Sequence, residues 1–216
     1  IMGAGVPREI PRVLTEYASH RTGHITIDVI NSTTTHRAAL NPVTMLGDEL
    51  PPLRRRNSLA IVTLHVLADY LNRDPEIRPD GFIVEGPTAG GHSSPPRGKV
   101  ALDEAGDPIY GPRDNADLEK IARVGLPFWL AGGFASPEKV AEARAAGAAG
   151  VQTGTLFALA DESGLTQDLR SQLHAELDAG TLVVRNDPRA SPTGFPFKVA
   201  QLPGTLSEEP VYQERE

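Results

Sequence analysis

The 216-residue sequence contains no cysteine, which excludes both a disulfide framework and a thiolate metal site. It has no apolar run of about 18 residues, so we expect no membrane-spanning helix and no membrane partner. Basic residues are in the minority, 21 Lys and Arg against 28 Asp and Glu, and this balance argues against a nucleic-acid-binding protein. Because 39% of the residues are hydrophobic, a packed core is expected. Together these features predict a cytoplasmic α/β protein.

Several motifs of known chemistry are also missing. No G-x-G-x-x-G follows a predicted strand, which argues against a dinucleotide-binding Rossmann fold. The hydrolase elbow G-x-S-x-G and the nucleotide-binding loop G-x-x-x-x-G-K-[ST] do not occur. His20 and His24 are four residues apart, but the strand-like sequence after Gly23 argues against a shared helical face. We therefore expect no metal.

Short apolar runs alternate with helical segments, and this alternation predicts a parallel sheet with right-handed crossovers. A doubly wound sheet and a (β/α)8 TIM barrel both fit the alternation. Glycine-rich elements follow the carboxyl ends of the strands, where barrel sites lie, and this placement favours the barrel. The predicted strands are Ser58–Leu64, Gly81–Val84, Pro127–Ala131 and Ala149–Gln152, and the predicted helices are His65–Arg73, Asn115–Val124, Pro137–Ala146 and one that begins at Leu156.

Two segments interrupt this rhythm within the single domain predicted for residues 1–216. Residues 24–53 hold a β-like run, His24–Ile30, and are interpreted as an insertion. Residues 181–216 form a C-terminal extension with a strand-like start at Thr181–Arg185 and an acidic end that we expect to fray. Ile1–Gly5 resembles the end of a strand, so we expect further residues upstream in the natural protein.

Two glycine turns on consecutive strands predict a phosphate site. They are Ala131-Gly132-Gly133 and Gln152-Thr153-Gly154-Thr155. Glycine allows a phosphate to reach the main-chain N–H groups, and loops after the last two strands of a barrel commonly form such a site. The alternative is that each glycine serves only its own turn.

A third glycine-rich stretch, Glu85–His92, follows the strand Gly81–Val84. Gly90 and Gly91 would let the backbone approach a flat ring, and His92 follows at once. Histidine can take or give a proton near neutral pH, so His92 is the candidate catalytic residue. The alternative is an ordinary histidine on a surface loop.

Three motifs, Ala89–His92, Ala131–Phe134 and Gln152–Thr155, occur in an order and spacing that resemble the nitronate monooxygenase family, formerly 2-nitropropane dioxygenases. Flavin-type enoyl-ACP reductases are relatives of that family. The resemblance implies a flavin mononucleotide (FMN) enzyme with a TIM-barrel fold. By this match the chain carries about strands 4 to 8, with Ile1–Gly5 as strand four, and lacks the first three strands.

The resemblance also implies roles for individual residues. His92 matches the histidine that removes the proton α to a nitro group or contacts the nitronate. Thr88, Phe134 and Thr153 differ from the usual family residues, and Glu85 stands where many members have a glutamine that contacts the flavin ring. The implied FMN-binding residues are Glu85, Gly90, Gly91, Gly132, Gly133, Gln152, Thr153, Gly154 and Thr155.

The leading hypothesis is FMN-dependent oxidation of alkyl nitronates by O2 to a carbonyl compound and nitrite, with a small-molecule substrate. The first alternative is an FMN-dependent enoyl-thioester reductase that uses NAD(P)H. The second is a barrel that binds a phosphorylated ligand without redox chemistry. The physiological substrate, the use of NAD(P)H and oligomerisation stay open.

Overall fold

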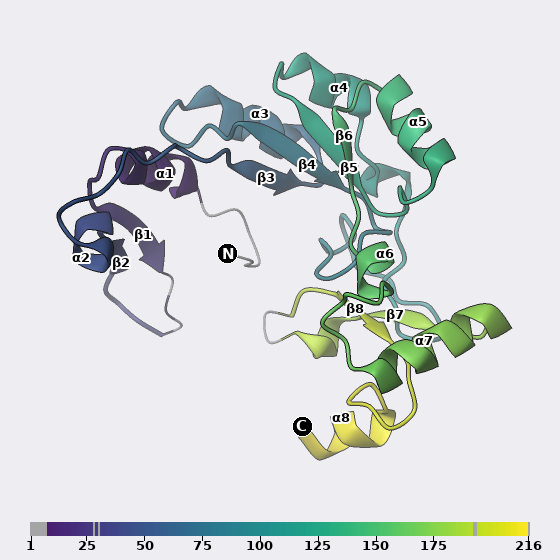
Figure 1. The fold of residues 1–216 in the computed structure, drawn as a ribbon. Coiled ribbons are helices and arrows are strands. Elements are labelled where there is room, and N and C mark those ends of the chain that lie inside the picture. Colours follow the sequence, from purple (N-terminus) through teal and green to yellow (C-terminus); the bar gives the residue numbers. More distant parts are fainter. Residues whose placement is uncertain (1–7, 28, 30, 192–193, 216) are drawn as a thin grey trace. The chain divides into compact units, whose positions relative to one another are not determined.

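A computed structural model describes residues 8–27, 29, 31–191 and 194–215. The chain divides into two compact units, Ile1–Ile83 with Asp117–Phe128, and Val84–Ala116 with Trp129–Glu216. Figure 1 follows the elements of both along the chain. The predicted strand at Ile1–Gly5 lies outside the described residues.

Four strands form a sheet in the order β3-β4-β5-β6. Strands β5 and β6 run parallel, with Trp129 opposite Gly150 and Ala131 opposite Gln152. Each strand falls within a predicted run or extends it by one residue, so the α/β fold with a parallel sheet is confirmed. The bounds are Leu59–Val62 for β3, Gly81–Glu85 for β4, Phe128–Ala131 for β5 and Gly150–Gln152 for β6.

The described part of the chain does not form a closed barrel. Its parallel sheet contains four strands, with β3 and β6 at the two edges. An eight-stranded barrel closes only when the first strand pairs with the last, and four strands cannot complete that circle. The sequence therefore predicted these strands correctly, whereas the closed barrel is not seen in the described residues.

Three helices accompany the sheet: α3 (His65–Arg73), α4 (Leu118–Arg123) and α5 (Pro137–Ala145). Helix α4 begins three residues after its predicted start because the Asp117 side chain caps it, accepting a hydrogen bond from Lys120 N at 3.1 Å. Helix α5 begins as predicted, with the Ser136 hydroxyl accepting from Lys139 N at 3.3 Å.

The first unit has a small apolar core. Leu71 of α3, Phe82 of β4 and Ile121 of α4 are completely buried. Helices α3 and α4 are also joined by a hydrogen bond of 3.2 Å from the Asn72 side chain to the Val124 carbonyl. This packing holds the first half of β4 in place, a few residues before the glycine-rich stretch begins.

The region predicted as an insertion contains an antiparallel pair of strands, β1 (Gly23–Ile27) and β2 (His36–Leu40). Helix α1 (Ile10–Ala18) precedes the strand pair, and helix α2 (Pro42–Leu46) follows the pair within the same region. The β-like run expected from His24 is therefore confirmed, although β1 is shorter than predicted.

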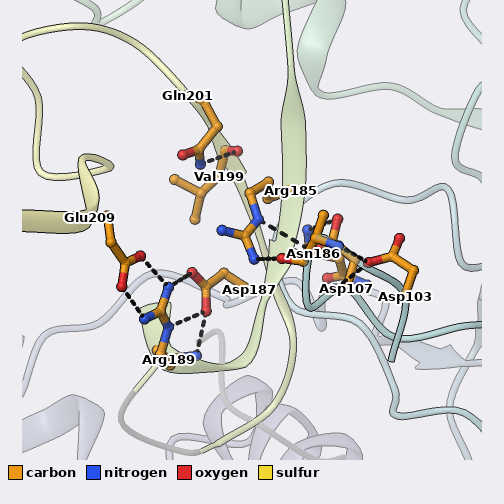
Figure 2. Close-up of polar contacts among 10 residues, drawn as sticks. Asp103, Asp107, Arg185, Asn186, Asp187, Arg189, Val199, Gln201 and Glu209 are labelled. Carbon is orange, nitrogen blue, oxygen red and sulfur yellow. Dashed lines mark hydrogen bonds and ion pairs between the residues drawn. The ribbon is translucent and has the colours of Figure 1, made fainter. Parts of the chain in front are cut away.

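The C-terminal extension is more ordered than the sequence indicated. Strands β7 (Val184–Asp187) and β8 (Phe197–Ala200) pair antiparallel, with Asp187 opposite Phe197. The prediction that the acidic end frays is wrong, because Glu209–Arg215 forms helix α8. Figure 2 shows the ion pairs that hold β7 and α8. The remaining elements are η1 (Pro112–Asp114), α6 (Thr155–Ala158), α7 (Gln167–Ala179) and η2 (Pro188–Ala190).

The longest helix, α7, has 13 residues. No helix within the described ranges combines the length and the apolar composition that a transmembrane segment requires.

Candidate functional site

The predicted motifs follow three neighbouring strands. Strand β4 ends at Glu85, β5 at Ala131 and β6 at Gln152, and these strands are adjacent in the sheet order. The carboxyl edge of an open α/β sheet is the usual place for a ligand site, because the loops there meet over the strand ends. All ten predicted site residues belong to the second compact unit.

The loop after β4 packs directly against the loop after β5. The Thr88 hydroxyl donates a hydrogen bond to the Gly132 carbonyl at 3.2 Å. A Cβ at Gly132 would lie 2.6 Å from Ala89 N, closer than real Cβ contacts come, and Gly132 also has a φ of +95°. Gly132 is therefore required both by its own backbone conformation and by the close approach of the neighbouring loop.

Glycines with uncovered main chain surround this contact. A Cβ at Gly91, Gly133 or Gly154 would meet no atom within 4 Å. A Cβ at Gly90 would reach only the Thr155 hydroxyl, at 3.9 Å, so the β4 loop also lies beside the start of α6. The missing side chains thus leave open space over the backbone, which is the space that an anionic group needs to approach main-chain N–H groups.

Glu85 and Gln152 are close together although they come from β4 and β6. Partial burial raises the pKa of the Glu85 carboxyl, and a hydrogen bond from the Gln152 side chain offsets this rise to a smaller extent. A carboxyl with a raised pKa holds its proton to higher pH, and in that form it can donate a hydrogen bond as well as accept one.

His92 is held by residues of the C-terminal segment. Its Nε2 lies 2.7 Å from the Ser191 hydroxyl, and its ring meets the Phe197 ring edge to face at 4.7 Å between centroids. The sequence predicted His92 as a site residue but did not predict these two neighbours. Ser191 and Phe197 lie about a hundred positions further along the chain, so no local pattern connected them to the histidine.

No group of three or more His, Asp or Glu side chains among the described residues is arranged to hold a metal ion.

The glycine loops thus follow the carboxyl ends of neighbouring strands in a parallel α/β sheet, which is where phosphorylated ligands and cofactors commonly bind in proteins of this class. The sequence model of the nitronate monooxygenase family matches residues 16–191, and the chain belongs to this oxidoreductase family.

Two known proteins are similar to parts of this chain. A dehydrogenase of Mycobacterium tuberculosis, named for the substrate (3aS,4S,5R,7aS)-5-hydroxy-7a-methyl-1-oxo-octahydro-1H-indene-4-carboxyl-CoA, is 32% identical over 121 residues, or 56% of this chain. The chain spans 29% of the length of that relative. A solved structure of a FabK mutant from Thermotoga maritima is 25% identical, with a TM-score of 0.43, and the match covers 67% of this chain and 40% of that one.

Proposed function

We propose that this chain belongs to an FMN-dependent oxidoreductase that converts alkyl nitronates and O2 to a carbonyl compound and nitrite. The observation that carries the proposal is the contact between the three glycine loops, with open space over Gly91, Gly133 and Gly154. Membership of the nitronate monooxygenase family supports it.

The loops after β5 and β6 suit the phosphate of FMN. Gly132 and Gly133 would offer uncovered main chain on one side, with Gly154 and the Thr155 hydroxyl on the other. In this arrangement the backbone of Gly90 and Gly91 would lie beside the flavin ring of FMN. Thr153, in the loop after β6, would also line the site. Bound FMN would supply the redox chemistry between the substrate and O2.

The polar end of the site is formed by Glu85 and Gln152. The amide of Gln152 can donate and accept hydrogen bonds, and the Glu85 carboxyl, whose pKa is raised by burial, accepts hydrogen bonds when ionised and can donate one only when protonated. We propose that this pair contacts polar atoms of the flavin ring.

His92 acts on the substrate. A nitroalkane must lose the proton on its α carbon to become a nitronate, and the imidazole accepts that proton. The overall reaction balances when two nitronate ions and one O2 give two carbonyl molecules and two nitrite ions. The protein residues contribute orientation and proton transfer.

We further propose that β3 to β6 are the last four strands of a (β/α)8 barrel within a single domain. The order β3-β4-β5-β6 and the position of the motifs at successive strand ends support this arrangement.

The phosphate site is tested with Gly154→Ala. Gly154 has a φ of −121° and open space around its Cβ position, so alanine fits the fold, but its methyl group would occupy the space assigned to the phosphate. We expect FMN affinity, measured by quenching of flavin fluorescence, to fall at least about tenfold with an unchanged unfolding midpoint. The matched control is Gly164→Ala, which also meets no atom within 4 Å.

Equal FMN affinity of the Gly154→Ala and Gly164→Ala proteins would contradict the assignment. A protein that binds phosphate esters but retains no flavin absorption after FMN is added and the unbound FMN is removed would favour the non-redox alternative.

The second candidate function is the FMN-dependent reduction of an enoyl thioester by NAD(P)H. The relative from Mycobacterium tuberculosis favours it, because its name describes a dehydrogenase of a carboxyl-CoA compound. Anaerobic reduction of the bound flavin separates the candidates: nitronate reduces it in the first case, and NADPH in the second.

A further inference from the structure

We propose that Ser191 is a positioning residue for His92: its hydroxyl accepts a hydrogen bond from Nε2–H of the neutral imidazole, which leaves Nδ1 as the basic nitrogen. This inference rests on the proposed function, in which His92 takes a proton from the substrate. It assigns a role to the C-terminal segment, which the predicted site did not include.

The contact between the two side chains is short and protected. Nε2 of His92 lies 2.7 Å from Oγ of Ser191, a normal hydrogen-bond length, and Ser191 is only 6% exposed. The His92 residue itself is exposed, and its Nδ1 has no hydrogen-bond partner among the described residues. One ring nitrogen is therefore held by the protein while the other is available to a substrate.

The plane of the imidazole is fixed independently. The ring of Phe197 meets it at an interplanar angle of 75°, an edge-to-face arrangement. The backbone on both sides of His92 is hydrogen-bonded to the chain around the start of β8. Ser93 N donates to Pro196 O at 2.8 Å, and Gly91 O accepts from Lys198 N at 2.9 Å. The histidine thus has little freedom to turn away from Ser191.

Ser191 is itself held in place by the turn before it. It follows η2, where the buried Asp187 carboxylate accepts a hydrogen bond from Arg189 N at 2.8 Å. The Arg189 guanidinium pairs in turn with Glu209 at the start of α8, at 3.0 and 3.1 Å. The hydroxyl therefore projects from a turn that a charged network stabilises.

The direction of this hydrogen bond decides which nitrogen can accept a proton, because a serine hydroxyl can either donate to Nε2 or accept from Nε2–H. A neutral imidazole carries one proton, and the nitrogen without it is the base. If Nε2–H donates to Ser191, Nδ1 keeps its lone pair for the substrate proton. A neutral hydroxyl orients the ring without the charge stabilisation that a carboxylate would add, so its contribution is that of one ordinary hydrogen bond.

The tautomer is read directly by 15N NMR of the full chain with labelled histidine and added FMN. The resonance of His92 is identified by its loss in His92→Gln. We expect the wild type to show the Nε2–H form and Ser191→Ala to show a mixture with the Nδ1–H form. Ser191→Thr retains a hydroxyl and should restore the wild-type pattern, and Ser171→Ala on the exposed face of α7 is the control.

Kinetics then separates positioning from a general structural effect. A nitroalkane must be deprotonated on the enzyme, whereas a preformed nitronate need not be. We expect Ser191→Ala to lower kcat about three- to tenfold with a nitroalkane and less than about twofold with its nitronate. A structural defect would lower both equally, and this result, or an unchanged tautomer, overturns the inference.

Failure of the proposed function has a different appearance. If the wild type oxidises neither compound, or if His92→Gln keeps full activity with the nitroalkane, the role of His92 as base is rejected. In that case an unchanged tautomer in Ser191→Ala would also reject the role of Ser191 in positioning the ring. A tautomer that changes in Ser191→Ala would show that Ser191 positions the ring, but not for proton removal from a nitroalkane.

Discussion

Two antiparallel strand pairs in the described part of the chain are similar in size but are stabilised in different ways. The β7–β8 pair is tied to its surroundings by charged and polar side chains: Arg185 pairs with Asp107 at 3.3 Å, and Asn186 donates to the Tyr110 hydroxyl at 3.0 Å. Asp187, at the end of β7, is 2% exposed and pairs with Arg189 at 3.3 Å. Figure 2 shows most of these contacts along one strand.

The β1–β2 pair contacts α1 mainly through apolar side chains, beside one long hydrogen bond of 3.4 Å from Thr26 N to the Glu9 carboxylate at the start of that helix. Gly23 lies so close to the helix that a Cβ there would be 2.8 Å from Val13 Cγ1, and Val13 is 4% exposed. Much of the strand pair is exposed, including Ile27 at its end.

The difference is related to what each pair carries. The two neighbours of the candidate catalytic histidine are Phe197, in β8, and Ser191, in the connection between β7 and β8, and hydrogen bonds and ion pairs fix direction as well as distance. Apolar contact resists separation but permits sliding, which is sufficient for a pair that presents no predicted site residue. We infer that directional contacts are concentrated where a side chain must be oriented.

The largest effect is expected from Asp187→Ala. It removes a buried carboxylate that accepts from the backbone and the guanidinium of Arg189, and we expect a loss of about 3 kcal/mol in the stability of the β7–β8 region. Hydrogen exchange should accelerate in β7 and β8 and stay unchanged in β1 and β2. The exposed Asp178→Ala in α7 is the control. Equal acceleration in both strand pairs would contradict the comparison.

Local patterns predicted the elements next to the sheet well. Helix α3 has its predicted bounds, and Ser136 with Pro137 placed the start of α5 correctly, because these depend on apolar runs and on capping within a few residues. The glycine motifs were also found at the predicted strand ends. Strand β8 and helix α8 were missed, because each depends on residues outside its own segment. Strand β8 pairs with β7, and Glu209 and Tyr212 of α8 contact Arg189 through hydrogen bonds and a cation–π contact of 4.7 Å.

The candidate site was also predictable only where it depends on local sequence patterns. The positions of Gly132 and Gly133 follow from the sequence, but the need for Gly132 to admit the neighbouring loop appears only in three dimensions. The hydrogen bond between His92 and Ser191 joins residues 99 positions apart, and a single serine has no pattern that indicates its partner.

A smaller effect is expected from Gly23→Ala, which tests the apolar strand pair. The added methyl group would push against Val13 and move α1 from β1, and we expect a loss of about 1–2 kcal/mol from overpacking. In a double-mutant cycle with Val13→Ala, the second substitution creates room, so the two losses should not add. Additive losses in urea titrations would show that the close approach of α1 does not limit this pair.

The smallest effect is expected from Glu209→Gln, and it depends on pH. The hydrogen bonds from Arg189 lower the pKa of the Glu209 carboxyl, so the native state favours its charged form. Such a group stabilises the fold above its unfolded-state pKa, near 4.5, and this stabilisation is lost as the pH falls through the lower native pKa. The urea midpoint of Glu209→Gln should therefore lie slightly below that of the wild type at pH 7 and approach it below pH 4.

Added salt should narrow the difference in urea midpoint at pH 7, because Glu209 is exposed and its ion pair is screened. A difference in urea midpoint that does not change with pH or salt would mean that α8 is held by the packing of Tyr212 rather than by charge. Charged contacts would then distinguish the β7–β8 region from the β1–β2 pair only as far as Asp187, and not at α8.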